Sequence, residues 1–156
     1  MKDPLTVRAH SYLLDHNVAT LATTSGAGDP GAAAIFYVND GFTLYFLSSP
    51  TSRHALNLTQ NPRVAVTIQE DYADWPEIKG VQLEGIAHEI SGEEETTARR
   101  LYGKKFPVVG LLAQAPAAIV KALAKVRWYK ILPRRVYFID NSLGLGHRDE
   151  IDFQEV

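Results

Sequence analysis

Residues 44–66 constrain the fold more tightly than any other stretch of this sequence. The stretch opens with an apolar run over residues 44–47, which predicts a strand covered on both faces. Serines, a threonine and a proline follow, and these residue types favour the start of a helix. Asn61-Pro62 ends the predicted short helix, because proline lacks a backbone N–H and restricts the residue before it. Alternating apolar residues over 63–68 then predict a second strand.

The corner between the first strand and the helix carries the candidate chemistry, since Arg53 and His54 directly follow Ser52. Free N–H groups at the start of a helix carry a partial positive charge and suit an anion. A guanidinium can bind a phosphate through two parallel hydrogen bonds, and an imidazole can add a donor. The corner is therefore a candidate phosphate site. An ordinary capped surface helix with a solvated arginine and histidine explains the same residues.

The order of these residues resembles the pyridoxamine 5′-phosphate oxidase-like, flavin mononucleotide (FMN)-binding split-barrel superfamily. The resemblance is collective and rests on a few short motifs, which are Phe46-Leu47-Ser48, Ser52-Arg53-His54, Leu58 and Asn61-Pro62-Arg63-Val64. In that family, the position of Arg53 and the basic position after it hold the FMN phosphate. This sequence has His54 where the family usually has lysine, which weakens the charge and keeps a hydrogen-bond donor.

The resemblance extends roughly from Val18 to Arg148 and implies a mainly β fold with peripheral helices. The expected architecture is a six-stranded antiparallel Greek-key split barrel of the FMN-binding type, formed by residues 1–156 as a single domain. A chain of 156 residues with 46% hydrophobic content can bury one substantial core. A second subunit completes the FMN groove in this family, so we expect a homodimer with cofactor sites at the subunit interface.

The resemblance also implies which residues contact the cofactor. The phosphate would be held by Ser52, Arg53 and His54. Backbone groups from two strands would lie along the ribityl chain and the flavin ring, and these belong to Ala33, Ala34, Ile35, Leu47 and Ser48. Gln82, in an alternating strand predicted over residues 81–87, is the candidate for a polar flavin contact that often comes from the second subunit.

The C-terminal stretch compares with the tail of the oxidase, in which Arg-x-His-Asp-Arg contacts substrate and FMN. Leu145 occupies the first arginine position, and the order His147-Arg148-Asp149 departs from the pattern. Ile139 stands where the oxidase has a preceding tryptophan. These departures argue against pyridoxamine phosphate oxidation itself. We expect His147 and Arg148 to face a substrate, with a purely structural tail as the alternative.

The remaining pattern predicts further strands and helices around this frame. Helices are predicted over residues 5–16, 91–106 and 116–125, and an irregular apolar segment over 107–114. Strands are predicted over residues 18–23, 32–38, 42–48, 126–132 and 135–139, the last two separated at Pro133. Asn39-Asp40-Gly41 predicts a hairpin turn.

Composition excludes several classes of function. A formal net charge of −2 and an estimated pI of about 6.2 give no indication of nucleic-acid or membrane binding. The sequence has no cysteine and its five histidines are dispersed, so we expect no metal site. No apolar run is long enough to span a bilayer and no signal peptide is visible. A soluble, cytoplasmic protein is expected.

The sequence thus favours an FMN-dependent oxidoreductase acting on an unidentified small molecule. In such an enzyme flavin N5 accepts or donates the hydride, and the protein orients the cofactor. No residue stands out as a general base. The alternatives are a non-catalytic flavin-binding or storage protein, and a deazaflavin- or haem-using member of the same fold.

Overall fold

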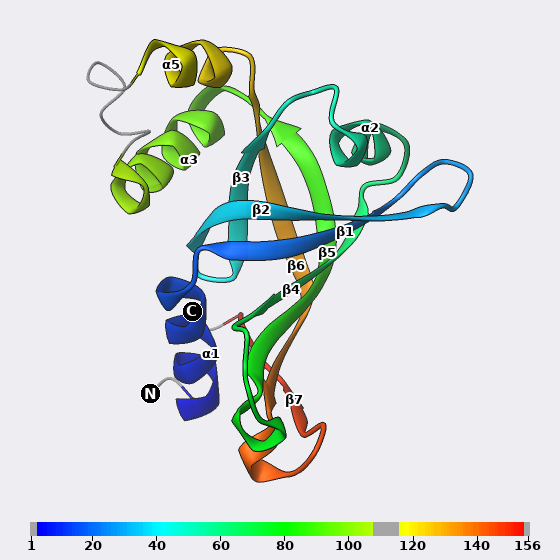
Figure 1. The fold of residues 1–156 in the computed structure, drawn as a ribbon, viewed down its shortest axis with the longest axis vertical. Coiled ribbons are helices and arrows are strands. Elements are labelled where there is room, and N and C mark those ends of the chain that lie inside the picture. The colour runs from blue at the N-terminus through cyan, green and yellow to red at the C-terminus, as the bar shows by residue number, and fades with distance from the viewer. Residues whose placement is uncertain (1–2, 108–115, 155–156) are drawn as a thin grey trace.

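The computed structural model, which describes residues 3–107 and 116–154, contains a closed antiparallel β-barrel (Figure 1). Its strands are β1 (Val18–Thr24), β2 (Pro30–Asp40), β3 (Thr43–Ser48), β4 (Arg63–Gln69), β5 (Lys79–Ile90) and β6 (Arg127–Asp140). They follow one another in the order β3-β2-β1-β4-β5-β6, and β3 pairs with β6 to close the barrel. The short strand β7 (Arg148–Glu150) adds to β6 outside the ring. The predicted six-stranded antiparallel barrel is confirmed.

Helices surround the barrel (Figure 1). They are α1 (Pro4–Asp15), α2 (Arg53–Gln60), α3 (Gly92–Lys105) and α5 (Ala117–Leu123), with short 3₁₀ turns η1 (Trp75–Glu77) and η3 (Asn141–Leu143). In Figure 1, α2 and α3 lie on opposite sides of one end of the barrel, and α1 lies along its flank. Apart from Pro107, the segment predicted to be irregular falls outside the described residues.

The barrel has a core of large side chains and an outer face of small ones. Fully buried residues on alternate strand positions include Leu21, Leu44, Phe46, Ile68 and Leu83. The intervening positions on the outside of neighbouring strands are small, namely Thr20, Ala22, Ala32, Ala34, Ala65 and Thr67. This alternation follows from the two-residue repeat of a strand. It leaves a shallow outer face across β2, β1 and β4.

The prediction of two final strands separated at Pro133 is wrong, because β6 runs unbroken through this residue. The ladder between β5 and β6 shifts register at this point, so Gly85 pairs with Pro133 while Glu84 pairs with Arg135. Arg134 is the extra residue of a β-bulge, which lets the strand continue past a proline that cannot donate a ladder hydrogen bond. The two predicted segments are therefore one strand.

Gly85 permits the close approach of the two strands at the bulge. A Cβ atom added to this residue would lie 2.3 Å from the carbonyl oxygen of Leu132. Because this neighbour is backbone, it cannot move aside without breaking the ladder. Any side chain at residue 85 is thus incompatible with the observed bulge.

We expect Gly85→Ala to lower the free energy of unfolding by about 2 kcal/mol, since overpacking of a buried site typically costs about 1–3 kcal/mol. Urea denaturation followed by circular dichroism measures the change. His88→Ala, an exposed substitution on the same strand, is the control and should change stability by less than about 0.5 kcal/mol. Equal stability of Gly85→Ala and the control would contradict the steric argument.

Candidate functional site

The corner between β3 and α2 has the geometry that its sequence predicts. Strand β3 ends at Ser48, and α2 begins at Arg53 with Ser52 as its N-cap. The Ser52 hydroxyl accepts a hydrogen bond from the backbone N–H of Ala55 at 3.2 Å. The helix ends at Gln60, directly before Asn61-Pro62. Local capping and proline therefore fix both ends of this short helix.

Two hydroxyls and an imidazole meet at this corner. The Ser48 Oγ lies 3.0 Å from the Ser52 Oγ and 2.6 Å from Nε2 of His54. Burial lowers the pKa of the half-buried His54 imidazole below its usual value, which favours the neutral ring. The three groups form a hydrogen-bonded cluster at the positive end of α2. Such a cluster can reorient its protons to donate to an anion.

Arg53 reaches from α2 across to the start of β2. Its exposed guanidinium donates from Nη2 to the carbonyl oxygen of Pro30 at 3.1 Å. Gly31 leaves room beside it, since a Cβ there would lie 3.4 Å from Nε of Arg53. A second link joins the same elements, because buried Asn57 donates to the Thr23 hydroxyl at 3.0 Å. Contacts with the hairpin of β1 and β2 thus fix the position of the Arg53 guanidinium.

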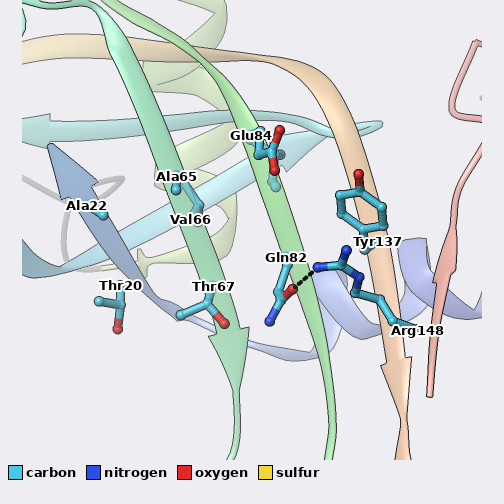
Figure 2. Close-up of a pocket in the computed structure, with 10 residues that line it drawn as sticks. Thr20, Ala22, Ala65, Val66, Thr67, Gln82, Glu84, Tyr137 and Arg148 are labelled. Carbon is cyan, nitrogen blue, oxygen red and sulfur yellow. Dashed lines mark hydrogen bonds between the residues drawn. The ribbon is translucent and has the colours of Figure 1, made fainter. Parts of the chain in front are cut away.

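A pocket of about 240 Å³ lies on the outer face of the barrel (Figure 2). It is lined by Thr20, Ala22, Ala65, Val66, Thr67, Gln82, Leu83, Glu84, Tyr137 and Arg148. The small outward side chains of β1 and β4 form its floor, and longer polar side chains from β5, β6 and β7 form one wall. The hollow therefore follows directly from the alternation described above.

The wall of this pocket joins two of the predicted site residues. The exposed Arg148 donates from Nη1 to the Gln82 Oε1 at 3.4 Å, as Figure 2 shows. Its guanidinium carbon lies 4.2 Å from the centre of the Tyr137 ring, a cation–π contact. His147 is instead bonded to Asp149, with 2.7 Å between Nε2 and Oδ2, and does not line the pocket. A role of His147 or Arg148 toward a substrate stays a prediction.

The other predicted contact residues are divided between the two sides of the barrel wall. Ala34 is exposed on the outer face and pairs with Thr20, which lines the pocket. Ile35 is buried in the core, so only its backbone can reach a ligand, and the neighbouring Ala33 is half-buried. Leu47 is half-buried and packs against the cluster around Trp128. Their contact with a cofactor stays a prediction.

A second hollow adjoins the pocket and extends to Pro30 at the start of β2. Its volume is about 520 Å³, and it shares Ala22, Ala65 and Glu84 with the pocket in Figure 2. At its other side it is lined by Pro30, whose carbonyl accepts the hydrogen bond from Arg53. The hollow thus reaches a backbone neighbour of Arg53, while the corner residues Ser48, Ser52 and His54 line neither hollow.

Several residues of this surface are not singled out by the sequence. Thr20, Thr67 and Tyr137 line the pocket, and Asn57 holds α2 against β1. The floor of the pocket could have been predicted from the small residues that stand at every second position of these strands. No local motif predicts Tyr137, which reaches the pocket only because β6 pairs with β5.

Within residues 3–107 and 116–154, none of the helices combines the length and the apolar composition that crossing a bilayer requires. In the same part of the chain, no three histidine, aspartate or glutamate side chains are grouped so that they could hold a metal ion.

Comparison with known proteins identifies the family. A family model described as pyridoxamine 5′-phosphate oxidase matches residues 5–140. The chain belongs to this family. A relative from Photorhabdus laumondii, a UPF0306 protein, is 30% identical over 141 residues, which are 89% of this chain and 90% of the relative. The name of that relative states no activity.

Solved structures with the same fold include proteins whose names refer to haem. A haem-binding protein from Mycobacterium smegmatis superimposes with a TM-score of 0.75 at 24% identity, over 97% of this chain but only 59% of that chain. The haem storage protein HutZ from Vibrio cholerae has a TM-score of 0.68 at 19% identity, covering 87% of this chain and 94% of HutZ. At these identities the similarity establishes the fold alone.

Proposed function

We propose that this member of the pyridoxamine 5′-phosphate oxidase family is a single FMN-binding domain that acts as an oxidoreductase on a small molecule. One observation carries the proposal, namely the cluster of Ser48, Ser52 and His54 at the start of α2 with Arg53 beside it. Hydroxyls, an imidazole and a guanidinium are the donors that a phosphate requires. This donor set fits the phosphate end of FMN.

Bound FMN would supply the hydride chemistry, and the protein would bind and orient it. Ser52, Arg53 and His54 would hold the phosphate, as the family resemblance implies. The backbone of residues 33–35 and 47–48 would lie along the ribityl chain and the ring. The exposed small side chain of Ala34 leaves space for a flat ring to approach this strand closely. Gln82 would contribute a polar contact to the flavin.

The proposal includes a homodimer with the cofactor sites at its interface. The outer face of β2, β1 and β4 consists of small residues, and these allow two barrels to approach closely. The face also carries large apolar side chains at one border, since Phe36 is 57% exposed and Val18 is 45% exposed. Exposed apolar surface of this kind marks interaction sites. The Gln82–Arg148 wall would then approach the FMN of the second subunit.

Haem is the second candidate, because the Mycobacterium smegmatis protein and HutZ are named for haem binding and storage. No histidine is among the residues that line the pocket in Figure 2, within the part of the chain that the structure describes. Deazaflavin binding and flavin storage without turnover are further alternatives. A deazaflavin-binding protein would take up a different ligand. A flavin-storage protein would bind FMN, but NADH or NADPH would not reduce the bound flavin.

We expect FMN to bind the wild-type protein, and Arg53→Ala to weaken binding about 10- to 100-fold, as loss of a charged hydrogen bond costs about 1.5–3 kcal/mol. Quenching of FMN fluorescence measures both affinities. Arg100→Ala, on the exposed side of α3, is the matched control and should bind like the wild type.

Four results would contradict this proposal or redirect it. No quenching by the wild type would count against FMN, and a Soret band on titration with haemin would favour haem. Unchanged affinity of Arg53→Ala would remove this residue from the phosphate site. Bound FMN that neither NADH nor NADPH reduces would favour a flavin-binding or storage role.

The pH dependence of FMN binding tests the role of His54. The half-buried imidazole has a lowered pKa and is neutral in the empty site near pH 7, whereas a phosphate dianion beside it favours the charged ring. Binding therefore takes up a proton, and affinity falls as pH rises, by at most about tenfold per pH unit. Titrations between about pH 6 and about pH 9 measure the slope.

His54→Lys is the control for this titration. The FMN phosphate also titrates near pH 6, and this affects both proteins equally. The ordinary pKa of lysine lies far above that of histidine, so the affinity of this variant should begin to decline only at a higher pH than that of the wild type. Parallel curves for the two proteins would show that His54 does not contact the phosphate.

A charged residue introduced at the proposed interface tests whether the protein forms this dimer. Ala65 is exposed on β4, so Ala65→Glu should leave the barrel folded but place a carboxylate between the two subunits. We expect light scattering to give a dimer mass for the wild type and a monomer mass for this variant. Ala122→Glu, on the exposed surface of α5, is the control and should remain dimeric. A monomeric wild type would overturn the interface.

A further inference from the structure

The imidazole of His16 lies between two oxygen atoms directly after the end of α1. Its Nδ1 is 2.6 Å from the backbone carbonyl oxygen of Tyr12, and its Nε2 is 2.7 Å from Oε1 of Glu70. The side chain of His16 is only 14% exposed, whereas that of Glu70 is 56% exposed. The contact joins α1 to the connection between β4 and β5, residues 70–78, which begins beside this helix (Figure 1).

Both oxygens can only accept a hydrogen bond, and this determines the protonation state of the ring. A backbone carbonyl has no proton to donate, and neither has an ionised carboxylate. A neutral imidazole donates from one nitrogen and accepts at the other, so it can satisfy only one of these oxygens. The charged ring, with a proton on each nitrogen, donates to both. The observed arrangement therefore requires a positive charge on His16.

The groups around this ring favour that charge. The ring stacks on the ring of Tyr12, with 3.9 Å between the centroids and 20° between the planes, and an aromatic face attracts a cation. Both residues line a hollow of about 780 Å³. The charged groups that line this hollow or bond to His16 are Asp15 of α1, Glu70, Asp71 and Glu77 of the connection, Lys79 of β5 and Lys105 of α3. Carboxylates thus outnumber ammonium groups around the ring.

Two side chains of α1 hold the first half of the connection. Glu70 bonds to His16, and the hydroxyl of Tyr72 lies 2.9 Å from the hydroxyl of Tyr12. Burial, together with the bond to Tyr72, raises the pKa of Tyr12, so its hydroxyl keeps its proton near neutral pH. Of these two contacts, only the one between His16 and Glu70 is expected to change with pH in this range.

The second half of the connection is fastened to the other end of the chain. The side chain of Asn141 donates to the carbonyl oxygen of Trp75 at 3.0 Å, and its backbone N–H donates to that of Ile78 at 2.9 Å. Ile78 lines a hollow of about 200 Å³ together with Gln82, the predicted flavin contact. The connection therefore runs from the contact with His16 to the wall beside Gln82.

We propose that the contact between His16 and Glu70 is a pH-sensitive latch, which fastens the connection between β4 and β5 to α1. As pH rises, the ring loses one of its two protons and can no longer donate to both oxygens. The carbonyl of Tyr12 is fixed in the helix, whereas the exposed Glu70 can bind water instead, so the contact with Glu70 opens. Histidine changes its charge between about pH 5 and about pH 8, so the latch operates around neutral pH. The inference goes beyond the proposed function and does not depend on FMN binding.

The test follows the ring and the connection in the same sample of the full chain. NMR spectra of the imidazole nitrogens report the protonation of His16. Hydrogen exchange of residues 70–78, corrected for the intrinsic effect of pH on amide exchange, reports opening of the connection. We expect both to change with one midpoint between about pH 5 and about pH 8. Protection of residues 70–74 should fall about two- to fivefold as pH rises, as is usual for the loss of a partly exposed ion pair.

Glu70→Gln is the decisive variant. The amide of glutamine can donate to a neutral Nε2, so this variant should keep the connection protected across the whole range. Glu93→Gln removes an exposed carboxylate at the start of α3, and as the matched control it should behave like the wild type. If the connection in Glu70→Gln opens with the midpoint of the wild type, the proposal is overturned.

Lys105 also titrates near this range. Its ammonium group donates to the carbonyl oxygen of His16 at 2.5 Å, and burial lowers its pKa to about 8. Lys105→Arg keeps a charged donor at every pH tested, so the connection should respond to pH as it does in the wild type. Loss of the response in this variant assigns it to Lys105 and overturns the proposal. A midpoint of the connection that differs from that of the His16 ring, or exchange that does not change between about pH 5 and about pH 8, overturns it as well.

Discussion

Pairing between β3 and β6 is the interaction on which the rest of the structure depends. Five residue pairs, from Leu44 opposite Ile131 to Ser48 opposite Arg127, close the ring of strands. Closure removes the two exposed strand edges that an open sheet would present. It also fixes the end of β3, and so the point where the chain turns into α2. The corner between β3 and α2 owes its position to this long-range pairing and its local geometry to the serine cap.

In a closed barrel, every strand residue faces either the inside or the outside. Here the side chains on the two sides differ in size. Large apolar residues fill the inside, while alanine and threonine cover β2, β1 and β4 outside. Exposure to solvent does not require small residues at these positions, because longer polar side chains would be equally well solvated. Small residues allow another surface to come close, and they create the hollow that Gln82 and Arg148 border. The same alternation therefore produces the core, the pocket and the proposed interface.

Local signals in the sequence were sufficient to predict the corner between β3 and α2, whereas contacts between distant residues could not be predicted. Ser52 caps α2 and Asn61-Pro62 ends it, as their residue types indicate. Alternation placed Gln82 on the outer side of its strand, but no local pattern brings it to Arg148, far along the chain. The strand break expected at Pro133 was wrong because Gly85, on the partner strand, permits a bulge there. The rules for proline consider only its neighbours in the sequence, whereas the residue that permits the bulge lies on β5.

The resemblance implies a lysine at the position of His54, and a histidine there changes the energetics of the corner when no ligand is bound. Burial would disfavour the charge of an ammonium beside Ser48 whenever no anion is bound. A histidine avoids that cost, since it can stay neutral while hydrogen-bonded to the Ser48 hydroxyl. Arg53 keeps its charge but is exposed and bonded to a carbonyl oxygen, so water and backbone stabilise it. The corner can thus persist without a ligand, and in the proposed function it would gain a second positive charge when the phosphate of FMN binds.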